Sequence, residues 1–175
     1  MNFTPFPELT TSRLTIRKLR IGDHKEVLFL RSDEAVNKFI KRATPKNLDD
    51  AEDFINKVSA GAEDGNIVYW AITMKDSPVM IGSICLWQFS KDEKEGEVGY
   101  DLNPAFHKQG IMSEALRCVL DFGFNNLKLD RIEAFTHRLN KGSVQLLLKN
   151  GFTELEGRTD ESNLDNAIFS VASGC

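Results

Sequence analysis

Cysteines are few in this sequence and long hydrophobic runs are missing, and both facts narrow the class of protein. The 175 residues include three cysteines, Cys85, Cys118 and Cys175, which lie far apart. Their odd number and the lack of CxxC or Cys/His spacing argue against a disulfide framework and against a metal site. No stretch approaches the 18 or so apolar residues of a membrane span, and no apolar leader follows a basic start. We therefore expect a cytoplasmic protein without a metal and without a membrane partner.

The chain also lacks a large excess of charge of either sign. The chain has 22 Lys plus Arg against 26 Asp plus Glu, which gives a formal net charge of −4, and the basic residues form no block. Binding to nucleic acid needs a basic face that neutralises phosphates, so we expect no nucleic-acid partner. A chain of this length makes one domain, which we place over residues 1–175.

The two commonest nucleotide-binding loops, GxGxxG and GxxxxGK[ST], do not occur. The most informative stretch is instead the run over residues 96–115. Val98, Tyr100 and Leu102 alternate as in a strand, Asn103 and Pro104 stop that strand, and from Ile111 the apolar residues recur at helical spacing. The run therefore predicts a strand, a polar loop and the start of a helix.

This loop has the features of an anion site. A helix N-terminus carries unpaired backbone N–H groups and a partial positive charge. Gly110 allows a ligand to approach the backbone closely, while His107, Lys108 and Gln109 add hydrogen-bond donors. The alternative is that Gly110 only forms a turn between the strand and the helix.

The periodicity along the chain predicts an α/β domain with a mixed, mostly antiparallel sheet. The helix after Gly110 leads to a strand at residues 131–136, and a helical crossover of this kind makes the two flanking strands parallel. Phe29, Phe39 and Phe54 are expected in the core, and Asp23 with Glu26 is expected to cap a helix. Trp87 is expected on a buried sheet face, and the alternative is that it lines a pocket. The expected strands are 13–19, 67–74, 79–89, 97–102 and 131–136, followed by two more around residues 157 and 168; the expected helices begin near residues 23, 33, 48, 110 and 140.

The run over residues 96–115 resembles the acyl-CoA pyrophosphate loop of the GNAT N-acetyltransferases. That family's pattern is Arg or Gln, two residues, Gly, one residue, and Gly or Ala. Its three defined positions correspond here to His107, Gly110 and Met112, of which Gly110 has the family's residue type and the other two depart from it. Segments 97–102 and 110–115 together resemble the RimJ/RimL-like branch, the ribosomal-protein N-terminal acetyltransferases. The likeness extends over nearly the whole chain, through residues 11–17, 131–134, Asn140, Ser143, 150–152 and 156–157.

The resemblance implies a single GNAT domain, with helices on both faces of the sheet, that uses acetyl-CoA as cosubstrate. In the family, the strand around Tyr100 to Leu102 parts from the strand after Arg131, and its freed N–H groups meet the acyl carbonyl and the pantetheine. The amides of Ile111, Met112 and Ser113 would hold the pyrophosphate, while the early helical region would form one wall of the acceptor groove. Asn140 is expected to contact the CoA arm or to cap a helix.

Two residues are candidates for proton transfer. The tyrosine that most GNATs carry four residues after Ser143 is Leu147 here, which cannot donate a proton. The resemblance to the N-terminal acetyltransferase branch therefore gives Ser143 the role of protonating the departing thiolate, while a role as helix cap stays open. Glu97 is our candidate base, acting directly or through a water molecule, and its alternative is a solvent-facing carboxylate at a strand edge.

The expected reaction is the direct transfer of an acetyl group from acetyl-CoA to a primary amine in a ternary complex. An α-amine with a pKa near 8 is roughly a tenth neutral at pH 7, whereas a lysine is neutral in only about four molecules in ten thousand. A site without a strong base therefore favours a protein N-terminus, and the resemblance implies first of all that of a ribosomal protein. The alternatives are a small amine such as a polyamine, an amino acid or an aminoglycoside, or a sensor that binds acyl-CoA without turnover; the sequence also leaves a homodimer open.

Overall fold

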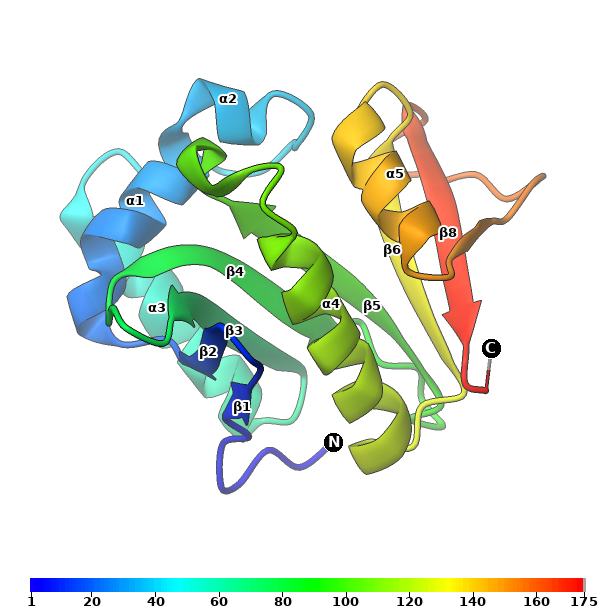
Figure 1. The fold of residues 1–175 in the computed structure, drawn as a ribbon, viewed down its shortest axis with the longest axis horizontal. Helices are drawn as coiled ribbons and strands as arrows, with labels where there is room; N and C mark the ends of the chain where they lie inside the picture. Colours follow the sequence, from blue (N-terminus) through cyan, green and yellow to red (C-terminus); the bar gives the residue numbers. More distant parts are fainter. Residues whose placement is uncertain (175) are drawn as a thin grey trace.

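A computed structural model describes residues 1–174, and Cys175 lies outside the described part. The chain forms one eight-stranded sheet in the order β1-β2-β3-β4-β5-β6-β8-β7 (Figure 1). The strands are β1 (Leu9–Thr10), β2 (Leu14–Lys18), β3 (Ile67–Met74), β4 (Met80–Trp87), β5 (Glu95–Leu102), β6 (Arg131–His137), β7 (Thr153–Glu154) and β8 (Asn166–Ala172). The helices are α1 (His24–Ser32), α2 (Glu34–Asn37), α3 (Leu48–Glu63), α4 (Ile111–Asp121) and α5 (Lys141–Lys149).

The two faces of the sheet carry separate hydrophobic cores. On one face, α4 covers the central strands and α5 lies over β6 and β8, and the core there includes fully buried Trp70, Ile84 and Leu116. On the other face, α1 and α3 pack against Ala71 and Met80. Because side chains alternate between the faces along each strand, one strand serves both cores.

The predicted topology is confirmed. Strands β1 to β5 pair consecutively and antiparallel, and β5 then pairs in parallel with β6 after the crossover through α4. Strand β8 lies antiparallel between β6 and β7. The expected α/β domain with one parallel central pair is therefore the observed one, although β7 lies at Thr153–Glu154 rather than around Gly157.

The helix expected after Gly110 is observed, and its last turn, Phe122–Asn126, is π-helical. One local prediction was wrong. Asp23 does not cap α1 with its side chain. Its carboxylate forms a buried ion pair with Arg17 at 2.7 Å and accepts a hydrogen bond from the Arg20 N–H at 2.8 Å, because it closes the preceding 3₁₀ turn instead.

Within residues 1–174, no helix combines the length and the apolar character needed to cross a bilayer.

Candidate active site

The central feature of the site is a gap in the sheet. Strand β5 pairs with β4 over its whole cleft-facing length, from Trp87↔Glu97 to Gly82↔Leu102. It pairs with β6 only from Glu95↔Arg131 to Glu97↔Glu133, although β6 continues along β8 to His137. The two parallel strands therefore separate after Glu97, so that β5 is already apart from β6 at Tyr100 to Leu102, the stretch that the sequence resemblance implied.

The gap exposes backbone groups of known direction. The Asn103 N–H donates to the Ile81 carbonyl across the β4–β5 ladder at 2.9 Å. Hydrogen-bonded pairs alternate in an antiparallel ladder, so Asp101 and Gly99 also bond toward β4. Tyr100 and Leu102 consequently direct their N–H groups toward the gap, where β6 no longer pairs with β5.

The loop before α4 opens at the same end of β5. Gly110 has a φ of 75° and immediately precedes the first residue of α4. The Glu114 N–H makes the first helical bond, to the Gly110 carbonyl at 3.0 Å. The amides of Ile111, Met112 and Ser113 thus come before any intrahelical bond, which is the arrangement that accepts an anion.

The side-chain donors predicted for this loop have different uses. The His107 ring contacts the Leu102 carbonyl through Nε2 at 3.0 Å, and the Gln109 amide donates to the Ala105 carbonyl at 3.0 Å. Both side chains therefore fasten the loop to itself. The Lys108 side chain is exposed, and its backbone adopts the left-handed conformation with a φ of 60°.

An ion pair from the start of the chain supports the loop from outside. Arg13 donates to Glu114 at 2.7 Å and to the Gln109 carbonyl at 3.1 Å. Burial would raise the pKa of Glu114, but hydrogen bonds from Thr11 and Arg13 lower it to about 2. The carboxylate in the first turn of α4 is thus neutralised by Arg13, and it does not repel an anion at the helix N-terminus.

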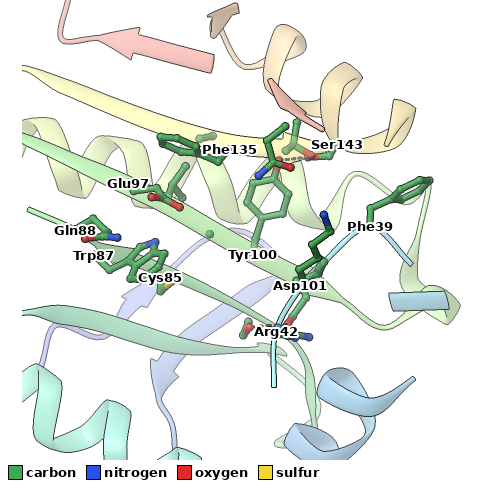
Figure 2. Close-up of a pocket in the computed structure, with 18 of the residues that line it drawn as sticks. Phe39, Arg42, Cys85, Trp87, Gln88, Glu97, Tyr100, Asp101, Phe135 and Ser143 are labelled. Atoms are coloured by element: carbon green, nitrogen blue, oxygen red, sulfur yellow. Dashed lines mark hydrogen bonds and ion pairs between the residues drawn. The ribbon is translucent and has the colours of Figure 1, made fainter. Parts of the chain in front are cut away.

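A cleft of about 750 Å³ lies along β4, β5 and β6 and is bordered by α1, α3 and the segment 39–42 (Figure 2). Trp87, 37% exposed, lines this cleft, and so do Phe39 and Phe54. Phe29 is 40% exposed. The predicted burial was therefore wrong for Trp87, Phe29 and Phe39, because α1–α3 cover the sheet face incompletely and leave a groove beside β5. Phe54 is partly buried and packs against the core beneath α1 and α3, as predicted, although it also borders the cleft.

Glu97 lies in this cleft at the point where the strands separate (Figure 2). Desolvation raises the pKa of Glu97 to about 7, and nearby Asp160 and Glu133 act in the same direction. A hydrogen bond from the Trp87 indole N–H opposes this shift. A carboxyl group that titrates near neutral pH is suited to accept a proton at that pH.

Ser143 and Tyr100 form a pair beside the gap. The Tyr100 and Ser143 hydroxyl oxygens lie 2.8 Å apart (Figure 2). Asn140, not Ser143, caps α5, because its Oδ1 accepts the Ser143 N–H at 3.2 Å. Burial raises the pKa of Tyr100 to about 12, so the phenol keeps its proton at neutral pH. The Ser143 hydroxyl is thus left free of a capping role.

Contacts between segments distant in the sequence cross one side of the cleft, near residues 39–41 and 160–166. Lys41 donates to Asn163 Oδ1 at 2.9 Å, and the Phe39 and His137 rings lie 5.2 Å apart. Asp160 orders the polar loop before β8 by accepting hydrogen bonds from Ser162 and Asn166. Within residues 1–174, no group of His, Cys, Asp or Glu side chains is arranged to hold a metal ion.

Sequence reasoning missed several contacts of the site. Tyr100 was selected for its backbone, and the contact of its hydroxyl with Ser143 depends on how α5 packs. The Arg13 and Glu114 pair joins residues 101 positions apart. In the sequence, Arg13 lies within residues 11–17, a segment that resembles the family, but no spacing rule connects it with Glu114.

Comparison with known proteins identifies the architecture. The family model described as "Acetyltransferase (GNAT) domain" matches residues 13–153. The uncharacterized N-acetyltransferase YoaA of Bacillus subtilis is 29% identical over 84% of this chain and 83% of its own length.

Two solved structures share the fold over almost their whole length. The ribosomal-protein-S5-alanine acetyltransferase of Vibrio fischeri superposes with a TM-score of 0.83 at 18% identity, covering 96% of this chain and 97% of its own. Spermidine N-acetyltransferase of Vibrio cholerae, in complex with CoA and spermine, superposes with a TM-score of 0.80 at 20% identity, covering 93% and 96%. The parted strands, the loop before α4 and the family match agree: this chain belongs to the GNAT acetyltransferase family and is an N-acetyltransferase.

Proposed function

We propose that this chain transfers the acetyl group of acetyl-CoA to the N-terminal α-amine of a protein, with ribosomal proteins as the first choice. The observation that carries the proposal is the separation of β5 from β6 after Glu97, with that carboxyl group on one face of the sheet and the Ser143 hydroxyl on the other. An amine and a thioester could approach each other through this gap from opposite faces.

The chain fits the cosubstrate through its backbone. The amides of Ile111, Met112 and Ser113 would bind the pyrophosphate, with the exposed Lys108 nearby as a further cation. The freed N–H groups of Tyr100 and Leu102 would meet the pantetheine and the acyl carbonyl. Asn140 supports this arm indirectly, because it fixes the start of α5.

Glu97 would act as the base. Its pKa near 7 leaves about half of the molecules ionised at neutral pH, and the ionised form takes the proton that the attacking amine loses. An α-amine with a pKa near 8 is already roughly a tenth neutral at pH 7, so a weak base suffices. A lysine side chain would need far more help, and this difference favours a protein N-terminus as acceptor.

Ser143 would supply the proton for the leaving group. The C–N bond forms, the C–S bond breaks, and the thiolate takes the hydroxyl proton of Ser143, which solvent later replaces. If Tyr100 donates its hydroxyl hydrogen to Ser143 Oγ, the Ser143 hydrogen is directed away from Tyr100 and is free for the thiolate. Tyr100 is thus a positioning residue in this proposal.

The test is a panel of peptides with free N-termini, matched peptides with a blocked N-terminus and one internal lysine, and small amines. Each is incubated with the protein and acetyl-CoA, and the products are identified by mass. We expect an added acetyl group on the α-amine and none on the blocked peptides. Acetylation confined to the blocked peptides or to small amines would contradict the proposal.

A polyamine is the second candidate acceptor. The observation in its favour is the similarity of fold to a structure of spermidine N-acetyltransferase solved with CoA and spermine. Spermidine and spermine therefore belong in the same panel, and preferential acetylation of either would favour this candidate.

A further inference from the structure

One arginine of the cleft forms no ion pair. Arg31 lies on α1, lines the cleft and stacks on Phe54, with its guanidinium carbon 3.9 Å from the ring centre. Such stacking holds a guanidinium in place. A hydrogen bond with the Tyr69 hydroxyl uses one of its five N–H donors and leaves the others available. Across residues 1–174, no carboxylate lies within 4.0 Å of it, whereas Arg13, Arg17 and Arg42 each have an acidic partner.

The nearest acidic group is already committed to other partners. Asp101 Oδ2 accepts from Arg42 at 2.9 Å, and its Oδ1 accepts from the Ser83 hydroxyl at 2.6 Å. Ser83 also contacts the Tyr69 hydroxyl at 2.7 Å. Burial, followed by the charge of Arg42, lowers the pKa of Arg31. This end of the cleft therefore has two arginines and one carboxylate, a local excess of positive charge.

The opposite end of the cleft is acidic. Glu97 lies there, and Asp160 and Glu133 are close enough to raise its pKa. Glu97 and Asp101 are four residues apart on β5 and face the same side of the sheet, which corresponds to about 13 Å along an extended strand. The cleft thus offers a carboxylate at the proposed position of the amine and an unpaired guanidinium farther along.

We propose that Arg31 binds a carboxylate of the acceptor, so that the acceptor is a polypeptide N-terminus with an acidic side chain at its second to fourth position. This inference rests on the proposed function and adds a substrate preference to it. An extended peptide advances about 3.3 Å per residue, and it therefore bridges the two ends of the cleft within four residues. In a free amino acid, a single carbon separates the amine from the α-carboxylate, which is too short. A polyamine would bring a second cation toward Arg31 and Arg42.

The test compares peptides that are identical except for position three, which is glutamate, glutamine or lysine. For the wild-type protein, we expect kcat/KM to be about tenfold higher with glutamate than with glutamine, because a charge-assisted hydrogen bond is worth that much, and lowest with lysine. Free glutamate is included to separate an acidic side chain in a peptide from an α-carboxylate. We expect it to be the poorer acceptor.

Arg31→Met keeps the apolar stem over Phe54 and removes the charge, so the ratio of glutamate to glutamine peptide should fall to about one. Arg31→Lys should keep part of the preference. The matched control is Arg20→Gln, which removes an exposed arginine that does not line the cleft and should leave the ratio as in the wild type.

Three outcomes would overturn the inference: equal rates for the glutamate and glutamine peptides in the wild type, an unchanged ratio in Arg31→Met, or faster acetylation of free glutamate than of the peptide. In the first two cases peptide acetylation itself would still support the proposed function. Failure to acetylate any peptide α-amine would instead contradict the proposed function, and the inference with it.

Discussion

The two edges of β5 differ in how they are paired: the edge toward β4 contributes to the stability of the sheet, and the edge toward β6 to the proposed chemistry. Toward β4 the ladder is continuous from Glu97 to Leu102, and the side chains behind it, such as Ile84 and Leu86, are fully buried. Toward β6 the ladder stops at Glu97. The paired edge holds the sheet together, whereas the unpaired edge keeps main-chain N–H groups available for a substrate. Five substitutions test this separation, and they follow from the largest expected effect to the smallest.

On the paired edge, Ile84→Ala should destabilise the fold by about 2–5 kcal/mol, because it leaves a cavity in a fully buried site. Denaturant unfolding measures this loss. The side chain faces the core beneath α4 and does not line the cleft. The kcat per folded molecule should therefore change much less than the free energy of unfolding; a large loss of kcat at unchanged stability would contradict the comparison.

On the unpaired edge, Glu97→Gln should lower kcat about 100-fold at pH 7, as expected when a general base is lost. The base acts in its ionised form, so wild-type activity should rise with pH through about 7, and the variant should lose this rise. A pH–rate profile from pH 5.5 to 9 measures both effects. The stability of the variant should not fall, since a buried carboxylate has been replaced by an uncharged group. An unchanged profile would exclude Glu97 as the base.

Ser143→Ala should lower kcat by about tenfold or more with little change in KM for acetyl-CoA, because it removes the proton donor. Tyr100→Phe should cost about fivefold, the equivalent of one hydrogen bond of about 1 kcal/mol. The double variant should be no slower than Ser143→Ala, since Tyr100 acts only through Ser143. Purely additive losses would contradict the positioning role, and an unchanged kcat of Ser143→Ala at every pH would exclude it as proton donor.

Gly110→Ala should raise the KM for acetyl-CoA about fivefold with kcat nearly unchanged, an effect no larger than that of Tyr100→Phe. The φ of 75° costs a residue with a Cβ about 1 kcal/mol, and the strain falls on the loop that would bind the pyrophosphate. The matched control is Gly22→Ala, where the added Cβ would meet no atom within 4 Å and no positive φ is required. Equal effects of the two substitutions would contradict a role for the Gly110 turn in binding.

The elements of the fold were largely predictable because the periodicity is strong where it matters. The alternation of Val98, Tyr100 and Leu102 and the helical spacing after Ile111 gave the central strand and α4, and the helical crossover required the parallel pair. Among the early aromatic residues, Phe29 and Phe39 were misjudged, whereas Phe54 packs against the core as predicted. Helical spacing shows that Phe39 and Phe54 share a side of the chain with apolar neighbours, but it does not show whether another element covers that side.

The same distinction holds for the site. Glu97 and Ser143 were selected from the sequence and its family resemblance, and both lie at the gap. Their partners Trp87 and Tyr100 come from positions that sequence spacing does not connect to them. The loop donors His107 and Gln109 are bound to the loop's own carbonyls, because the folded loop brings those acceptors within 3.0 Å.

The sequence by itself determined the order of strands and helices, the left-handed turn at Gly110 before α4, and the alternation that places Glu97 and Tyr100 on opposite faces of β5. These features depend on local geometry, in which each residue constrains only its neighbours along the chain. Only the tertiary structure decided where β5 leaves β6, how Arg13 reaches Glu114, and that Arg31 stays without an acidic partner while Arg42 takes Asp101. Such contacts join residues up to about a hundred positions apart, and their energies depend on burial and distance, which exist only once the chain has folded.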